Sequence, residues 1–165
     1  MIIRTAKICL VAAIALFYTV VVFNNLTDYN SNYHFVFHVL SMDSTFPGNN
    51  GMWRAVHSSF IYHSFYHSII CWEALTAVLS WTGALLLLKK LKAPAGAFNL
   101  AKRVSIAALS LGLLLWLVAF LTIGAEWFLM WQSKTWNGQE AAFRMFTVIG
   151  IILIFLVMPD VEEQA

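Results

Sequence analysis

Apolar residues gather into four long runs, separated by polar stretches of very different length. The runs cover about residues 8–24, 64–88, 104–130 and 141–158. A helix that crosses a hydrocarbon core of about 30 Å needs roughly 20 mostly apolar residues. No run alternates polar and apolar positions with period two, as the strands of a membrane barrel do. The pattern therefore predicts an all-α fold, a four-helix transmembrane bundle.

The longest polar stretch, residues 25–62, lies between the first two spans and is too short for an independent domain. Within it, apolar positions recur at helical spacing from Tyr33 to Leu40. They predict a short helix over residues 32–42, which Asn30 or Ser31 would cap. We expect a single integral membrane domain, residues 1–165, in which this stretch forms a short extracytoplasmic helical cap.

Composition and charge agree with a membrane protein. Hydrophobic residues make up 61% of the chain and charged residues only 11%, whereas soluble domains have roughly 45–50% and about 25%. This difference excludes an ordinary water-soluble domain. The formal net charge of +2 is too small to suggest a nucleic-acid partner.

The basic residues predict the orientation of the bundle. Seven of the ten lysines and arginines lie before the first span or in the connection over residues 89–103. They are Arg4, Lys7, Lys89, Lys90, Lys92, Lys102 and Arg103. Because positive residues concentrate on the cytoplasmic side, both termini and the 89–103 loop are expected in the cytoplasm. Residues 25–62 are then expected on the outer side.

Polar groups within or beside the apolar runs predict a cluster at the outer end. Glu73 lies about 22 Å along its helix from Leu88, and Arg144 about 21 Å from Met158, at ~1.5 Å per residue. Their similar depth and opposite charge predict an ion pair or a shared polar network. The other expected members are Glu126, Asn24, Asn25, Asp28 and Arg54. Such a cluster either holds the helices in register or forms a small pocket open to the outer face.

Histidines offer an alternative chemistry at the same end. His63 and His67 have the i, i+4 spacing that places two imidazoles on one helical face, and His38 falls in the cap. With nearby acids they could form a copper, zinc or iron site, or one of them could ligate haem. The chain has neither a His-Glu-x-x-His motif nor a cysteine ligand pattern. We therefore expect no cofactor and keep metal or redox binding as the alternative.

The chain contains motifs at Asn24–Asn32, His38–Asp43, Trp53-Arg54, Trp72-Glu73 and Glu126–Trp131. These motifs resemble a bacterial family of predicted small integral membrane proteins with a domain of unknown function. The resemblance implies a protein of the bacterial inner membrane and brings no reaction, cofactor or catalytic residue. The leading hypothesis is a non-enzymatic membrane protein or accessory subunit. Its expected partners are the lipid bilayer and either other membrane subunits or further copies of itself.

Overall fold

A computed structural model describes residues 1–162, which form helices joined by turns, with no strand in that range. The helices are α1 (Ile2–Thr27), α2 (Tyr29–Ser41), η1 (Met52–Arg54), α3 (Ser59–Lys89), α4 (Ala95–Leu114), η2 (Leu115–Trp127), η3 (Met130–Gln132) and α5 (Gln139–Val157). Four helical stretches are long and apolar enough to cross a membrane: α1, α3, the continuous α4–η2 and α5. The predicted all-α fold with four spans is confirmed.

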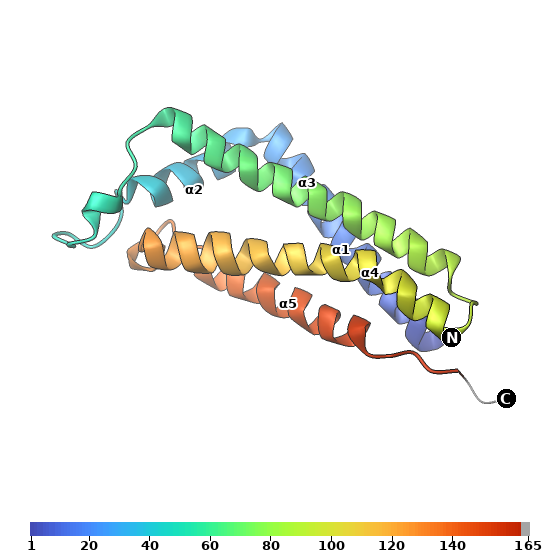
Figure 1. Cartoon of the computed structure of the whole chain (residues 1–165). Helices are drawn as coiled ribbons and strands as arrows, with labels where there is room; N and C mark the ends of the chain where they lie inside the picture. The colour runs from blue at the N-terminus through green and yellow to red at the C-terminus, as the bar shows by residue number, and fades with distance from the viewer. Residues whose placement is uncertain (163–165) are drawn as a thin grey trace.

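The four long helices lie roughly along one direction, with α2 across one end (Figure 1). Helix α3 packs against both α1 and α4, α5 packs against α4 and η2, and α1 also contacts α5. The N-terminus, the described segment after α5 and the α3–α4 turn lie at one end of the bundle, which we call the terminal end (Figure 1). The opposite end, which we call the cap end, carries α2 and the turns between η2 and α5 (Figure 1).

Helix α2 begins earlier than the predicted residue 32. The chain bends at Asp28, whose backbone angles of φ −128° and ψ 61° separate α1 from α2. Asp28, and not Asn30 or Ser31, occupies the cap position, and its carboxylate accepts a hydrogen bond from the Ser31 hydroxyl at 2.6 Å. Helix α2 ends where Met42 adopts a left-handed conformation, with φ 55°. Almost no linker therefore separates the cap helix from the first span.

The third span also begins earlier than the sequence pattern suggests. Pro94 occupies the cap position of α4, because a proline fits a helix start, where a backbone N–H would have no partner. Lys102 therefore lies inside the helix and not in the 89–103 loop. The same span continues as the wider π-helix η2, where the Phe128 N–H donates to the Ile123 carbonyl at 3.0 Å. The wider turns change which side chains of this span face the bundle.

Small residues allow α3 and α4 to approach closely. Ser105 and Ala108 of α4 are buried, as expected for a helix–helix contact between spans, whereas the buried Gly112 faces Tyr18 of α1 and Ile149 of α5. Gly83 of α3 lies so near α4 that a Cβ atom there would be 2.8 Å from the Ser105 backbone nitrogen. The outward faces are instead apolar and exposed, for example at Leu85, which suits contact with lipid.

Candidate functional site

A cavity of about 240 Å³ lies toward the cap end of the bundle. Five elements supply its wall, namely α1, α2, α3, η2 and α5, and the loop residue just before α5 contributes as well. The lining residues are Val21, Asn25, Asn32, Phe35, Val36, Tyr66, Ile69, Glu73, Trp116, Phe120, Gly138 and Ala141. Asn32 and Ala141 are exposed and lie at its rim. The cavity combines an aromatic wall with a few polar groups, as small-molecule sites commonly do.

Glu73 is the charged residue of this cavity. It is only 3% exposed, and its Oε2 accepts a hydrogen bond from the Asn25 amide at 2.7 Å. The Asn25 carbonyl in turn accepts from the Asn32 amide at 2.6 Å. The three side chains join α3, α1 and α2 and fix the bend at Asp28. Within residues 1–162, the second carboxyl oxygen of Glu73, Oε1, has no hydrogen-bond partner.

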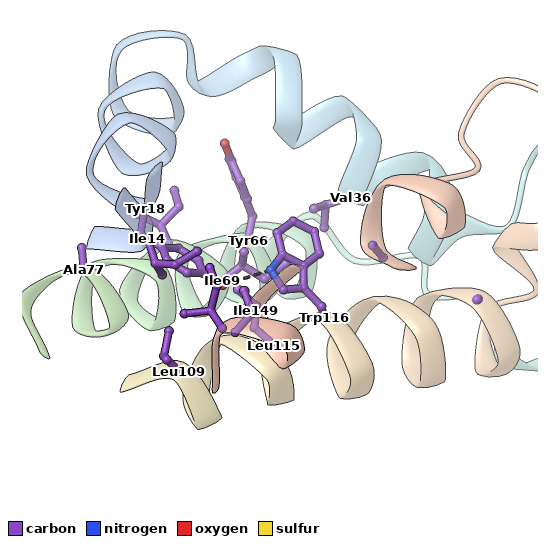
Figure 2. Packing of buried hydrophobic residues seen from close by; sticks show 14 of the residues in the cluster. Ile14, Tyr18, Val36, Tyr66, Ile69, Ala77, Leu109, Leu115, Trp116 and Ile149 are labelled. Carbon is purple, nitrogen blue, oxygen red and sulfur yellow. Dashed lines mark hydrogen bonds between the residues drawn. The ribbon is translucent and has the colours of Figure 1, made fainter. Parts of the chain in front are cut away.

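Two tyrosines beside Glu73 differ in whether their hydroxyl groups are paired. Tyr18 of α1 is fully buried and accepts a hydrogen bond from the Trp116 indole N–H at 3.0 Å (Figure 2). Tyr66 of α3 is 1% exposed, and Figure 2 shows its hydroxyl directed toward the bend between α1 and α2. In the part of the chain that the structure describes, this hydroxyl has no partner. Because buried hydroxyl groups are normally paired, it can serve a bound molecule.

The predicted ion pair between Glu73 and Arg144 is not formed. Arg144 is exposed on α5, and no ion pair of its side chain occurs in the described range. The two residues have similar depth, but Glu73 is buried whereas Arg144 is exposed and is not part of the cavity wall. Asn25, which is uncharged, takes the place of the expected arginine. Glu73 therefore has no positively charged partner among residues 1–162.

Of the other residues expected in the polar cluster, the structure brings only Asn25 to Glu73. Asn24, Asp28 and Glu126 are exposed. Arg54 lies apart from the cavity, where it donates to the Trp127 carbonyl at 3.2 Å and stands over that indole ring. Counting residues along each helix gave the depth of these side chains in the bundle. It could not show which side of each helix faces inward.

The predicted histidines are not part of the cavity wall and do not converge on one point. The Tyr29 hydroxyl lies 2.8 Å from His63 Nδ1 and 3.1 Å from His67 Nε2, so it can donate to one ring and accept from the other. His38 instead contacts Asp43 at 2.7 Å and stacks on Trp136. No group of three His, Cys, Asp or Glu residues in the described range could hold a metal ion.

Burial also affects Tyr29, which lies outside the spans. It raises the pKa of Tyr29, and the neighbouring Tyr33 adds to the effect. Tyr29 therefore keeps its proton near neutral pH and acts as a neutral hydrogen-bonding group between the two histidines. The arrangement is a hydrogen-bonded aromatic lid and lacks the convergent ligands that a metal site needs.

A second buried polar cluster, at the terminal end, was not predicted. The Asp160 carboxylate lies 2.8 Å from Lys7 Nζ and 2.5 Å from Lys102 Nζ, and Arg4 Nε lies 3.8 Å away. Both lysines also donate to the Met158 carbonyl, at 2.7 and 2.8 Å. The cluster joins α1, α4 and the segment after α5.

Further bonds hold this C-terminal segment in place. The Asn99 amide donates to the Asp160 carbonyl at 2.9 Å, and the Asp160 N–H donates back to Asn99 Oδ1 at 3.0 Å. Burial acts to raise the pKa of Asp160, but hydrogen bonds from Lys102 and Lys7 and their charges outweigh it, so the pKa lies below its usual range. The sequence did not mark these lysines as buried, because Lys7 precedes the first apolar run and Lys102 falls in the predicted 89–103 loop.

Comparison with known proteins agrees with the resemblance drawn from the motifs. The family model described as predicted small integral membrane protein (DUF2165) matches residues 3–159. No curated protein and no solved structure matches the chain.

Proposed function

The chain belongs to the family of predicted small integral membrane proteins, and we propose that it is a non-enzymatic protein that binds a small ligand in the cap-end cavity. As a multi-span integral membrane protein it holds this cavity between its helices. The supporting observation is the pairing of two groups with free hydrogen-bonding capacity in one cavity. Glu73 Oε1 and the Tyr66 hydroxyl both lack a protein partner within residues 1–162.

The polar groups support binding more than catalysis. Covalent catalysis needs a nucleophile within hydrogen-bond reach of a base. Among the described residues, the cavity wall contains no serine, cysteine, lysine or histidine. Glu73 and Tyr66 can instead orient a ligand, while the surrounding aromatic and aliphatic groups remove it from water. A cavity of about 240 Å³ suits a ligand smaller than a drug-sized molecule, whose pockets measure about 300–1,000 Å³.

The proposed setting is the bacterial cytoplasmic membrane, with both termini in the cytoplasm. The clustering of basic residues near the terminal end supports this orientation, and the cavity would then open toward the outer side. A reporter enzyme fused after Ala165 should be active only in its cytoplasmic form. Periplasmic activity of the fusion would reverse the orientation. That the protein is a subunit of a larger assembly, or self-associates, stays a prediction.

Metal or redox binding is the weaker alternative. His63 and His67 already share Tyr29, and His38 lies with Asp43 and Trp136. A metal site would require these groups to exchange their present partners.

A bound ligand can be detected by its mass even when its identity is unknown. Protein taken directly from its own membrane into lipid nanodiscs would be examined by native mass spectrometry. We expect a bound small molecule in the wild type that is lost in Ala141→Phe, which fills the cavity rim. Ala107→Phe, at an exposed position of α4 away from the cavity, serves as the matched control. Identical bound masses in the wild type and in Ala141→Phe would refute the proposal.

A further inference from the structure

The cavity contains one carboxyl side chain that has no charged partner among the described residues. Glu73 is a carboxyl group within a span, 3% exposed, and its protein partner in the described range is the neutral Asn25 amide. A buried carboxylate is costly unless a positive group or several donors balance it. The nearest candidate by depth, Arg144, is exposed on α5. A ligand that carries a positive charge would supply the missing partner.

Part of the same cavity wall is aromatic. Trp116 and Phe120 lie with ring centroids 4.8 Å apart, and Phe35 stacks on Phe120 at 6.3 Å. All three rings line the cavity. The faces of aromatic rings attract cations, and cages of such rings recognise alkylated ammonium groups. The Glu73 carboxyl group and the three aromatic rings can therefore both contact one organic cation.

We infer that the ligand of this cavity is a small alkylammonium ion, held by Glu73 and by the wall of Trp116, Phe120 and Phe35. The inference rests on the proposed function and names its ligand class. The Tyr66 hydroxyl, 1% exposed and without a partner in residues 1–162, supplies one hydrogen bond to a polar substituent of the ligand.

Inorganic cations fit this cavity less well. A hard ion such as Ca²⁺ takes six to eight oxygen ligands, and Mg²⁺ takes about six in octahedral geometry. Among the described residues, the side-chain oxygens of the wall without a partner are Glu73 Oε1, the Tyr66 hydroxyl and Asn32 Oδ1, and the remaining surface is mostly aromatic and aliphatic. Anions are disfavoured because the carboxylate would repel them. The same wall suits an organic cation, whose alkyl groups need no oxygen ligands.

Matched probes of the same shape separate charge from size. Choline would be compared with its neutral isostere, 3,3-dimethylbutan-1-ol, by calorimetric titration of the protein in lipid nanodiscs. We expect choline to bind at least tenfold more tightly than the isostere. Glu73→Gln, which keeps the shape and an acceptor for Asn25, should weaken choline binding at least tenfold and leave the isostere unchanged. Glu126→Gln, at an exposed acid outside the cavity, should bind choline like the wild type.

A second variant keeps the test decisive if Glu73→Gln does not fold. Phe120→Leu keeps the apolar volume and removes an aromatic face, so it should weaken choline about threefold or more and barely affect the isostere. Equal binding of choline and the isostere, or of choline to wild type and Glu73→Gln, would overturn the inference. So would failure of choline, tetramethylammonium and methylammonium to bind.

The test distinguishes the two levels of the proposal. If the isostere binds as tightly as choline and Ala141→Phe blocks both, the cavity is a ligand site but the cation inference is wrong. If no probe binds and native mass spectrometry shows no bound molecule in the wild type, both proposals fail together.

Discussion

Replacing Asp160 by asparagine removes the carboxylate that contacts two buried lysines at the terminal end. The side chains of Lys7 and Lys102 are 1% and 3% exposed, and that of Asp160 is 6% exposed. The asparagine keeps the shape of the side chain but not its charge. Lys7 and Lys102 would then be buried at the end of the bundle with no anionic partner among the described residues.

The expected loss of stability depends on which hydrogen bonds the two lysines keep in the variant. Removing one partner of a buried ion pair costs about 3–5 kcal/mol. Each lysine keeps its hydrogen bond to the Met158 carbonyl, at 2.7 and 2.8 Å, which favours the lower end of that range. We expect Asp160→Asn to lower the free energy of unfolding by about 3 kcal/mol.

Unfolding by sodium dodecyl sulfate in mixed micelles, followed by tryptophan fluorescence, can measure this change. Glu162→Gln is the matched control. Glu162 is exposed and accepts one bond from the Ala95 N–H at 2.5 Å, and a glutamine retains that acceptor. The control should therefore lose less than about 1 kcal/mol.

A double variant tests whether the loss arises from the unpaired charge. Adding Lys102→Met to Asp160→Asn removes one unpaired charge, so it should recover part of the lost stability. Residues in direct contact show such non-additive effects. If Asp160→Asn unfolds like the wild type, or if the two losses simply add, the cluster does not stabilise the protein as argued.

Further predictions concern pH, packing and buried hydrogen bonds. Because the pKa of Asp160 is lowered, its contribution is complete above the unfolded-state value of about 3.9 and disappears as the pH falls through the folded-state pKa. The wild type should therefore lose more stability in acid than Asp160→Asn, and parallel pH profiles would contradict this. Gly83→Ala should cost about 1–3 kcal/mol, since its Cβ would lie 2.9 Å from a Cα of α4, whereas Gly96→Ala, with open space around it, should cost nothing measurable. Tyr18→Phe leaves the Trp116 N–H without its acceptor and should cost about 1–3 kcal/mol in the same unfolding assay; no loss would show that this bond is dispensable.

Hydrophobic patterning predicted the four spans because the need for about 20 apolar residues is a local property of each segment. Helix ends were less predictable. The pattern placed the third span at residues 104–130, whereas the structure begins α4 at Ala95. Lys102 made the start of that helix look like a loop, because its partner, Asp160, lies at the other end of the chain.

The depth of a side chain in the bundle could likewise be counted along its helix from the sequence. The direction in which that side chain points around the helix axis could not. Glu73 was correctly singled out as a polar group that needs a partner inside a span. Counting along the helices favoured Arg144, whereas the structure gives the hydrogen bond to Asn25, 48 residues away. Tyr66 was not singled out at all, since only packing shows that its hydroxyl is buried without a partner.

By itself, then, the sequence determined the all-α class, the four spans, the cap segment and the family. The first three depend on composition or periodicity within a short window, and the family on motifs that resemble it along the chain. Only the tertiary structure decided that Glu73 faces an aromatic cavity and that Lys7 meets Asp160 across 153 residues. The physical reason is that the rise per residue fixes the height of a side chain, whereas rotation about the helix axis and the choice of neighbouring helix depend on packing of the whole bundle.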